Sequence, residues 1–117
     1  MLLVDTSVWI AHFRHGNVGL TPYLDKGHVA CHPFVIGELA CGNFRNRSET
    51  LSLLRKLPMA ILAEHNEVME LIDSRSLMGK GLGYIDAHLL ASAILTRISL
   101  WTLDRKLAET AARLDLC

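Results

Sequence analysis

The sequence predicts an α/β fold in which helices cover both faces of a parallel sheet. Short, continuously apolar segments, such as LLV at 2–4 and ISLWTL at 98–103, alternate along the chain with longer segments of helical character. Strands that are apolar throughout indicate a sheet buried on both faces, which is typical of parallel sheets. We therefore expect a three-layer α/β/α sandwich around a mostly parallel sheet of four to five strands.

The first strand leads directly into a helix. LLV at 2–4 is β-compatible, and the next residues are Asp5, Thr6 and Ser7, which are types that cap helices by accepting a backbone N–H. The segment SVWIAHFRH then has the composition of a helix. A side chain placed between a strand and a helix in this way lies at one edge of the predicted sheet.

The middle of the chain continues the alternation. A second strand is expected at 28–31, and a proline in the first turn favours a helix over 33–44. Another helix is expected over 48–57, a third strand at 60–63, and an amphipathic helix over 65–78.

The glycines of GKGLG interrupt the chain at 79–83, ahead of the most apolar helix. That helix is expected over 84–96, and because it is apolar on nearly every side it should be buried. A fourth strand follows at 98–103, and Asp104 is placed to cap a last helix that reaches 112 or 114. A fifth strand would have to be short, since the chain ends soon after Leu116.

Composition limits the function classes that remain open. At 117 residues the chain fits one domain over 1–117, and its 12 Lys and Arg balance 12 Asp and Glu, so any nucleic-acid contact must be local. No apolar run reaches the roughly 18 to 20 residues of a membrane span, and the N-terminus lacks the charge pattern of a signal peptide. Three cysteines without C-x-x-C spacing predict neither a disulfide framework nor a zinc site. A cytoplasmic location is expected.

Four carboxylates are embedded in or abut apolar segments: Asp5, Glu38, Asp86 and Asp104. Ligands of open parallel sheets bind beyond the carboxyl ends of the strands, and Asp5 and Asp104 each follow a predicted strand there. Burying several carboxylates without a partner is costly, so their convergence favours a cation. Magnesium suits such an all-oxygen ligand set.

Each of these carboxylates also has a purely structural explanation. Asp5 and Asp104 could be plain helix caps, and Asp86 would interact favourably with a helix dipole whether or not it binds anything. Glu38 could lie on a solvent-exposed stripe of its helix. All four structural explanations holding at once is less expected than any single one of them holding. The sequence therefore favours a shared pocket.

The same four segments resemble the PIN domain family, specifically the VapC toxins of bacterial toxin-antitoxin pairs. MLLVDTSVWI is similar to the family's first strand with its aspartate, and VIGELACG to the segment that holds its glutamate. GKGLGYIDAHLLASAIL and LWTLDRKL are similar to its third and fourth acidic motifs in order and spacing. The resemblance extends over essentially the whole chain.

The resemblance implies an endoribonuclease that depends on Mg²⁺ or Mn²⁺, with the four carboxylates as catalytic and metal-binding residues. Nearby hydroxyls would orient the carboxylates or metal-bound waters: Thr6, Ser7 and Thr102. The resemblance further implies an RNA substrate, with transfer RNA as one candidate, products with 5′-phosphate and 3′-hydroxyl ends, a VapB-type antitoxin as partner, and a homodimer.

Candidate contacts to RNA and antitoxin follow from position in the sequence. Basic residues near the ends of predicted elements could contact phosphates, with a solvated surface as the alternative: Arg14, Lys80, Arg97, Arg105 and Lys106. Aromatic residues on two helices could form a groove for an antitoxin helix, with core packing as the alternative: Trp9, Phe13, Phe34 and Phe44.

Two other functions remain open from the residues alone. One is a metal-dependent phosphatase, although haloacid-dehalogenase-like phosphatases need an aspartate at the place that Ser7 occupies. The other is a non-catalytic PIN-like module that binds RNA or protein, which an intact carboxylate quartet makes the weaker hypothesis.

Overall fold

The sheet lies at the centre of the protein and is parallel throughout. A computed structural model describes all residues, Met1–Cys117, and its three strands are β1 (Leu2–Val4), β2 (Val29–Ala30) and β3 (Ser99–Trp101). The strand order is β2-β1-β3, so β1 pairs in parallel with both other strands. The carboxyl ends of β1 and β3 therefore lie side by side, as the sequence required for a shared site.

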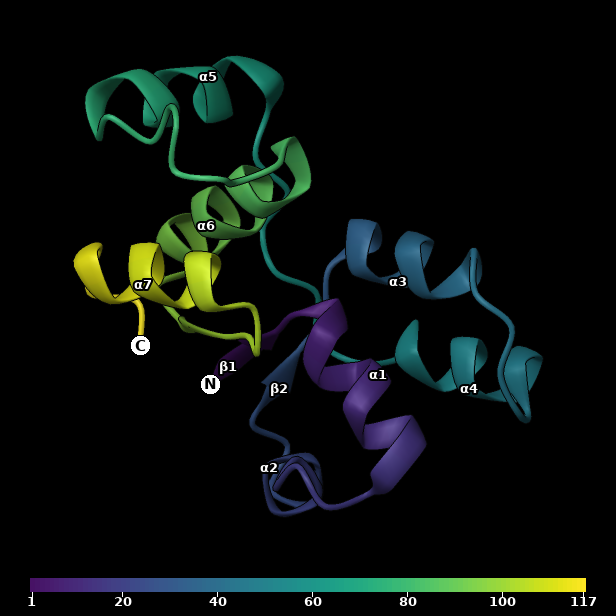
Figure 1. Cartoon of the computed structure of the whole chain (residues 1–117). Helices are drawn as coiled ribbons and strands as arrows, with labels where there is room; N and C mark the ends of the chain where they lie inside the picture. The colour runs from purple at the N-terminus through teal and green to yellow at the C-terminus, as the bar shows by residue number, and fades with distance from the viewer.

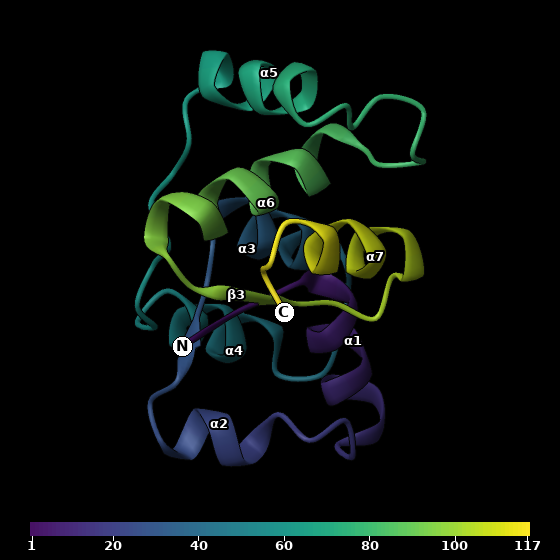
Figure 2. The same ribbon diagram turned by 90° about the vertical axis from the view of Figure 1, so that its left-hand side faces the viewer.

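Seven helices surround the sheet: α1 (Thr6–His15), α2 (Thr21–Asp25), α3 (Pro33–Ala40), α4 (Arg47–Leu54), α5 (His65–Ser74), α6 (Tyr84–Thr96) and α7 (Arg105–Arg113). Figure 1 shows α1, α3 and α4 on one side of the strands and α5, α6 and α7 on the other. In the view of Figure 2, α6 and α7 lie in front of β3, with α1, α3 and α4 behind the sheet. The predicted three-layer α/β/α sandwich is confirmed.

The predicted strand count of four to five is wrong, because the segment 60–63 does not form a strand. Cys31 donates its N–H to the carbonyl of Pro58 and accepts from Ala60, each at 2.8 Å, and these bonds make one isolated bridge. β2 is only two residues long, and α3 begins after only two further residues, so the outer edge of β2 offers too little backbone for a longer ladder.

A fifth strand is also absent, although the C-terminus begins to cover the edge of β3. The Leu116 carbonyl accepts the N–H of Leu100 at 2.6 Å, and this is a single contact. The chain ends within one residue of it.

Several helix ends differ from the predicted ones by a few residues. α3 ends at Ala40 instead of 44, where the guanidinium of Arg47 donates to the carbonyls of Ala40 and Gly42 and terminates the helix. α5 ends at Ser74 instead of 78, close to a left-handed residue at Ser76. The short helix α2, with proline in its first turn, was not predicted.

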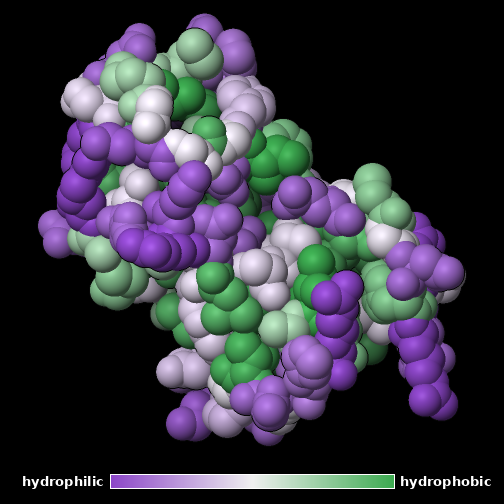
Figure 3. All heavy atoms as spheres, in the orientation of Figure 1, coloured by the Kyte–Doolittle hydropathy of each residue, from purple (hydrophilic) through white to green (hydrophobic).

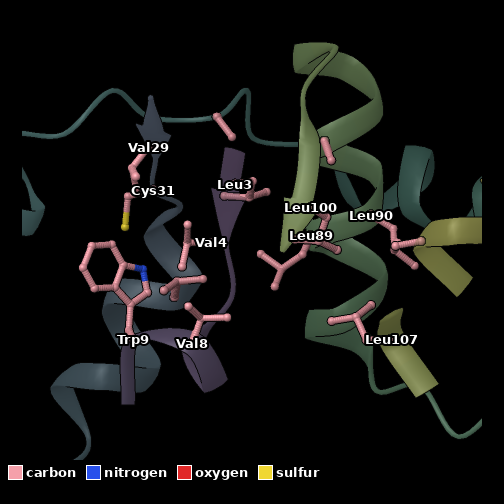
Figure 4. Close-up of a cluster of buried hydrophobic side chains, with 14 of the residues drawn as sticks. Leu3, Val4, Val8, Trp9, Val29, Cys31, Leu89, Leu90, Leu100 and Leu107 are labelled. Atoms are coloured by element: carbon pink, nitrogen blue, oxygen red, sulfur yellow. The ribbon is translucent and has the colours of Figure 1, made fainter. Parts of the chain in front are cut away.

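The hydrophobic core fills both spaces between the sheet and its helices. Figure 4 shows Leu3 and Val4 of β1 between Val8 of α1 on one side and Leu89 of α6 on the other. α6 is buried over seven consecutive residues, 87–93, which confirms the prediction for this helix. None of the seven helices combines the length and apolar composition needed to cross a lipid bilayer.

Candidate active site at the carboxyl edge of the sheet

Asp5 lies where β1 ends and α1 begins, and its carboxylate is held through one oxygen. Asp5 Oδ2 accepts the hydroxyls of Ser7 and Thr102, both at 2.7 Å, and the Ser7 N–H at 3.4 Å. The N-cap explanation is therefore correct, but it accounts only for Oδ2. Asp5 is 7% exposed, and no protein group donates to its Oδ1. That free oxygen is the one that could bind a cation.

Thr102 and Ser7 connect the carboxyl ends of the two neighbouring strands. The Thr102 hydroxyl accepts the N–H of Asp104 at 3.0 Å, and the Ser7 hydroxyl accepts the N–H of Leu103 at 2.9 Å. The two hydroxyl oxygens lie 3.2 Å apart. This hydrogen-bond network fixes Asp5 relative to the loop that leads into α7.

Asp104 and Asp86 each sit at the start of a helix. Asp104 Oδ1 accepts the Leu107 N–H at 2.9 Å, which makes Asp104 the N-cap of α7. Asp86, in the first turn of α6, accepts the Gly83 N–H at 2.9 Å through Oδ2. As for Asp5, each carboxylate is attached to the fold through one oxygen and leaves the other available.

The electrostatics of Asp86 connect these carboxylates. Partial burial raises the pKa of Asp86, and the negative charges of Asp5 and Asp104 raise it further, against a lowering effect of the hydrogen bond from Gly83. An effect of this kind requires that Asp5 and Asp104 lie within electrostatic reach of Asp86. Three carboxylates distant in sequence therefore lie at a common edge of the sheet.

Glu38 lies beside this edge on α3 and is exposed to solvent. Its Oε1 accepts the hydroxyl of Thr6 at 2.8 Å, and Thr6 is the first residue of α1, directly after Asp5. Exposure agrees with the solvent-stripe explanation of Glu38, while the Thr6 bond places it next to the Asp5 segment. Each of the three predicted hydroxyls thus contacts one of the predicted carboxylates.

The donor set fits a hard divalent ion by its chemistry, although it is not a closed cage. No group of three or more His, Cys, Asp or Glu side chains is arranged to hold a metal ion in this structure. The available donors are all oxygens, and the pKa of Asp86 is raised by burial and, to a smaller degree, by the charges of Asp5 and Asp104, which favours cation uptake. Magnesium keeps several waters and needs only one or two direct carboxylate ligands, so a closed cage is not required.

The predicted RNA-contacting residues are not all near the carboxylates. Arg14 lines a groove together with Glu38. Arg97 directly follows the last residue of α6, about 20 Å along that helix from its start near Asp86. The structure therefore does not bring Arg97 to the site, because the residue precedes β3 and lies at the amino edge of the sheet.

The other three predicted basic residues lie on or opposite α7. Arg105 pairs with Glu109 at 3.1 Å, and Lys80 and Lys106 line one pocket. Arg113 lines the same pocket and was not singled out from the sequence. Its signal was the seven-residue spacing from Lys106, which places both side chains on one face of a helix.

The predicted aromatic group divides into two parts. Phe13 and Phe44 stack with ring centroids 5.0 Å apart and line the groove of about 200 Å³ beside Glu38. Trp9 is buried and packs behind Phe13. Phe34 instead packs against His88, at 4.7 Å, and does not line this groove.

His88 lies two residues after Asp86 in sequence and is a hydrogen-bonded core residue. It is buried, and its Nε2 lies 2.9 Å from the hydroxyl of Tyr84. The Tyr84 hydroxyl oxygen also lies 2.5 Å from His65 Nδ1. The Tyr84–His88 spacing of four residues on one helix could have predicted the first of these contacts.

Known proteins are similar to this chain in sequence or in fold. Residues 2–113 match the PIN domain family. Ribonuclease VapC32 of Mycobacterium tuberculosis, in strains CDC 1551 / Oshkosh and ATCC 25618 / H37Rv, is 43% identical over 113 residues, which cover 96% of this chain and 91% of that protein. The crystal structure of PAE2754 from Pyrobaculum aerophilum aligns with a TM-score of 0.65 and 20% identity, over 97% of this chain and 94% of that one. At this identity the latter similarity shows the fold alone.

Proposed function

The chain belongs to the PIN domain family as a VapC-type ribonuclease, and we propose that it cuts RNA internally with a divalent metal ion held by its four carboxylates. The metal would be Mg²⁺ or Mn²⁺, and residues 1–117 would act as one PIN domain. As the toxin of a toxin-antitoxin pair, it would work in the cytoplasm on an RNA substrate, for which transfer RNA is one candidate.

The observation that best supports this proposal is the electrostatic state of Asp86. Partial burial of Asp86, and in addition the charges of Asp5 and Asp104, raise its pKa against the Gly83 hydrogen bond, so its ionised form has a free-energy cost that a cation would offset. In the absence of a cation, a proton on Asp86 can neutralise this carboxylate. The proton would reside on Oδ1, since Oδ2 accepts the Gly83 N–H. Metal binding would release that proton.

The residues of the site have separable roles in hydrolysis. When bound, a divalent ion supplies a Lewis acid that activates water and neutralises charge on the leaving oxygen. Asp5, oriented by Ser7 and Thr102, and Asp104, oriented by its capping bond, would hold that ion at the strand ends. Asp86 and Glu38 would complete the set from α6 and α3. Attack of water on phosphorus with cleavage of the P–O3′ bond would leave a 5′-phosphate on one product and, once the departing O3′ takes up a proton, a 3′-hydroxyl on the other.

The groove beside Glu38 suits the partner that the family implies. It lies between α1 and α3, is half apolar, and contains Phe13 and Phe44 together with Glu38. An apolar groove next to a carboxylate matches an amphipathic helix with a basic residue at one end. A VapB-type antitoxin bound here would place that basic residue at the catalytic edge. Homodimerisation is a further part of the proposal.

The decisive experiment maps the ends of cut RNA. Purified, antitoxin-free protein is incubated with total RNA and Mg²⁺, and discrete new 5′-phosphate ends are expected that disappear with EDTA and with Asp5→Asn. Asp25→Asn is the matched control, since Asp25 is an exposed aspartate on α2, away from the four carboxylates (Figure 1). Cleavage that persists in EDTA or in Asp5→Asn would contradict the proposal.

The same experiment separates the two other functions. A non-catalytic module would bind RNA and produce no new ends. A phosphatase would release inorganic phosphate from existing ends without internal cuts.

A further inference from the structure

A second polar pocket lies beside α7, outside the carboxylate edge. It has a volume of about 190 Å³, and its lining contains no hydrophobic residue: Lys80, Lys106, Glu109, Thr110 and Arg113. Four of these residues come from α7, where spacings of three, four and seven place them on one helix face. Lys80 comes from the loop between α5 and α6. Figure 3 shows hydrophilic atoms gathered over α7 and this loop.

Three cationic side chains of the pocket form no salt bridge within the protein. Its one acidic member, Glu109, pairs with Arg105 at 3.1 Å, and that is the only salt bridge of the chain. Lys80, Lys106 and Arg113 therefore have no carboxylate partner. In a chain with a net charge of zero, three such cations around one cavity are a local concentration that attracts an anion.

Two contacts hold the pocket in shape. The Lys106 side chain lies across the backbone of Gly81, where an added Cβ would be 2.5 Å from Lys106 Cδ and 2.7 Å from Nζ. Arg113 Nη2 donates to the Arg75 carbonyl at 3.0 Å. The loop thus contacts α7 at both ends of the pocket, and the bond to Arg75 positions Arg113 before any ligand arrives.

The position of the pocket relates it to the carboxylates. Asp104 caps the helix that supplies most of the pocket, and Lys106 follows Asp104 by two residues. The rise of the helix from Asp104 to Arg113 is about 14 Å, which is the length of a few nucleotides of a single strand. A chain of phosphates that reaches the carboxylates can therefore also reach the pocket.

We propose that this pocket binds a backbone phosphate of the RNA strand that flanks the bond to be cut. Arg113 and Lys106 would contact the phosphate oxygens, which positions the strand without reading its sequence. These are positioning residues and take no part in bond cleavage. The inference rests on the proposed ribonuclease function.

The test uses protein that carries Asp5→Asn, so that the RNA is not cut. It measures the affinity of this protein for a mixed-sequence single-stranded RNA over a range of salt concentrations. Lys106→Gln and Arg113→Gln should each weaken binding about tenfold and lower the slope of log affinity against log salt by about 0.7. Arg97→Gln is the control, because it removes the same charge at the opposite edge of the sheet. Unchanged affinity and slope in both pocket variants would overturn the inference.

A glycine pair tests the geometry of Lys106 without removing its charge. Gly81 and Gly79 have φ values of 78° and 70°, so alanine imposes similar backbone strain at both, but only at Gly81 does it displace Lys106. In the otherwise native enzyme, Gly81→Ala should raise KM for RNA about threefold to tenfold with kcat retained, and Gly79→Ala should not. Equal changes in KM for the two variants would count against the inference.

The outcomes separate this inference from the proposed function and from other ligands. If RNA binds through the pocket but is never cut, the ribonuclease proposal fails and the phosphate site stands. If inorganic phosphate alone is bound with the same dependence on Lys106 and Arg113 while RNA is not, the pocket takes a free anion and the inference fails. Loss of antitoxin binding without loss of RNA binding in these variants would assign the pocket to a protein partner and would also overturn it.

Discussion

The hydroxyl of Thr102 donates a 2.7 Å hydrogen bond to the carboxylate of Asp5, although 97 positions separate the two residues in sequence. The parallel register of β1 and β3, with Val4 opposite Trp101, places the residues after each strand side by side. The same hydroxyl accepts the N–H of Asp104 at 3.0 Å. The Thr102 side chain therefore bonds both the carboxylate of Asp5 and the backbone of Asp104, and the pairing of β1 with β3 makes that possible.

Replacing Thr102 by valine should damage both stability and metal use. The change keeps the shape of the side chain but leaves Asp5 Oδ2 without one donor and the Asp104 N–H without its acceptor. We expect the free energy of unfolding to fall by about 1–3 kcal/mol and the Mg²⁺ concentration for half-maximal cleavage to rise about tenfold. Denaturant unfolding and a Mg²⁺ titration of cleavage measure the two effects. Thr102→Ser retains the hydroxyl, so equal losses in both variants would argue against this role.

Asp86→Asn should abolish cleavage without destabilising the metal-free protein. The folded-state pKa of Asp86 is raised, so its ionised form opposes folding, and this cost appears as the pH rises through the carboxyl range. Asparagine removes the charge and can still accept the Gly83 N–H. At neutral pH in EDTA we expect an unchanged or higher melting temperature, with cleavage reduced more than about 100-fold.

The control for this prediction is Glu38→Gln, since Glu38 is exposed and its removal should change the metal-free melting temperature little. Added Mg²⁺ should raise the melting temperature of the native protein more than that of Asp86→Asn. A large loss of metal-free stability in Asp86→Asn would mean that this side chain is structural.

The placement of carboxylates at one edge of the sheet could be predicted because its signals are local. Asp5 and Asp104 come at or soon after the end of a strand, and a hydroxyl that contacts each of them, from Ser7 and Thr102, lies two residues away in sequence. A carboxylate in an apolar segment is conspicuous in sequence whatever the tertiary structure. Parallel pairing of β1 and β3 then brought these local features together.

The errors arose where the outcome depended on a distant partner. The segment 60–63 has the composition of a strand, but β2 is too short to pair with it beyond Cys31. Arg97 is near β3 in sequence, yet it precedes the strand, and only the carboxyl end of a parallel strand faces the site. Neither the length of a neighbouring strand nor the edge of a sheet that a residue occupies can be read from the residue's own segment.

The groove beside Glu38 predicts which phenylalanine matters for antitoxin binding. Phe44→Ala removes one ring of the stacked pair that lines the groove, and we expect affinity for a VapB-type antitoxin to fall about tenfold to 100-fold. Phe34→Ala is the matched control, because Phe34 packs on His88 outside the groove. Affinity is measured by calorimetry with purified antitoxin, after circular dichroism shows that both variants are folded. Equal weakening by the two variants would remove the groove from the interface.

Buried His32 predicts a loss of stability in acid that is independent of the four carboxylates at the sheet edge. His32 Nδ1 accepts the Phe34 N–H at 3.0 Å, so Nε2 holds the ring proton and donates it to the Ser92 hydroxyl, also at 3.0 Å. Burial, and secondarily the charge of His88, lower the pKa of His32 from 6.5 to about 4.

Between pH 6.5 and about 4, the folded state keeps His32 neutral whereas the unfolded state protonates it. The contribution of His32 to stability is therefore complete above pH 6.5 and is lost as the pH falls toward about 4. The loss is on the order of 3 kcal/mol. His32→Asn keeps an acceptor for the Phe34 N–H but cannot titrate, so the gap in unfolding free energy between native protein and variant should narrow steadily over this range. Urea unfolding at a series of pH values measures that gap, and two parallel curves would show that His32 is not the titrating group.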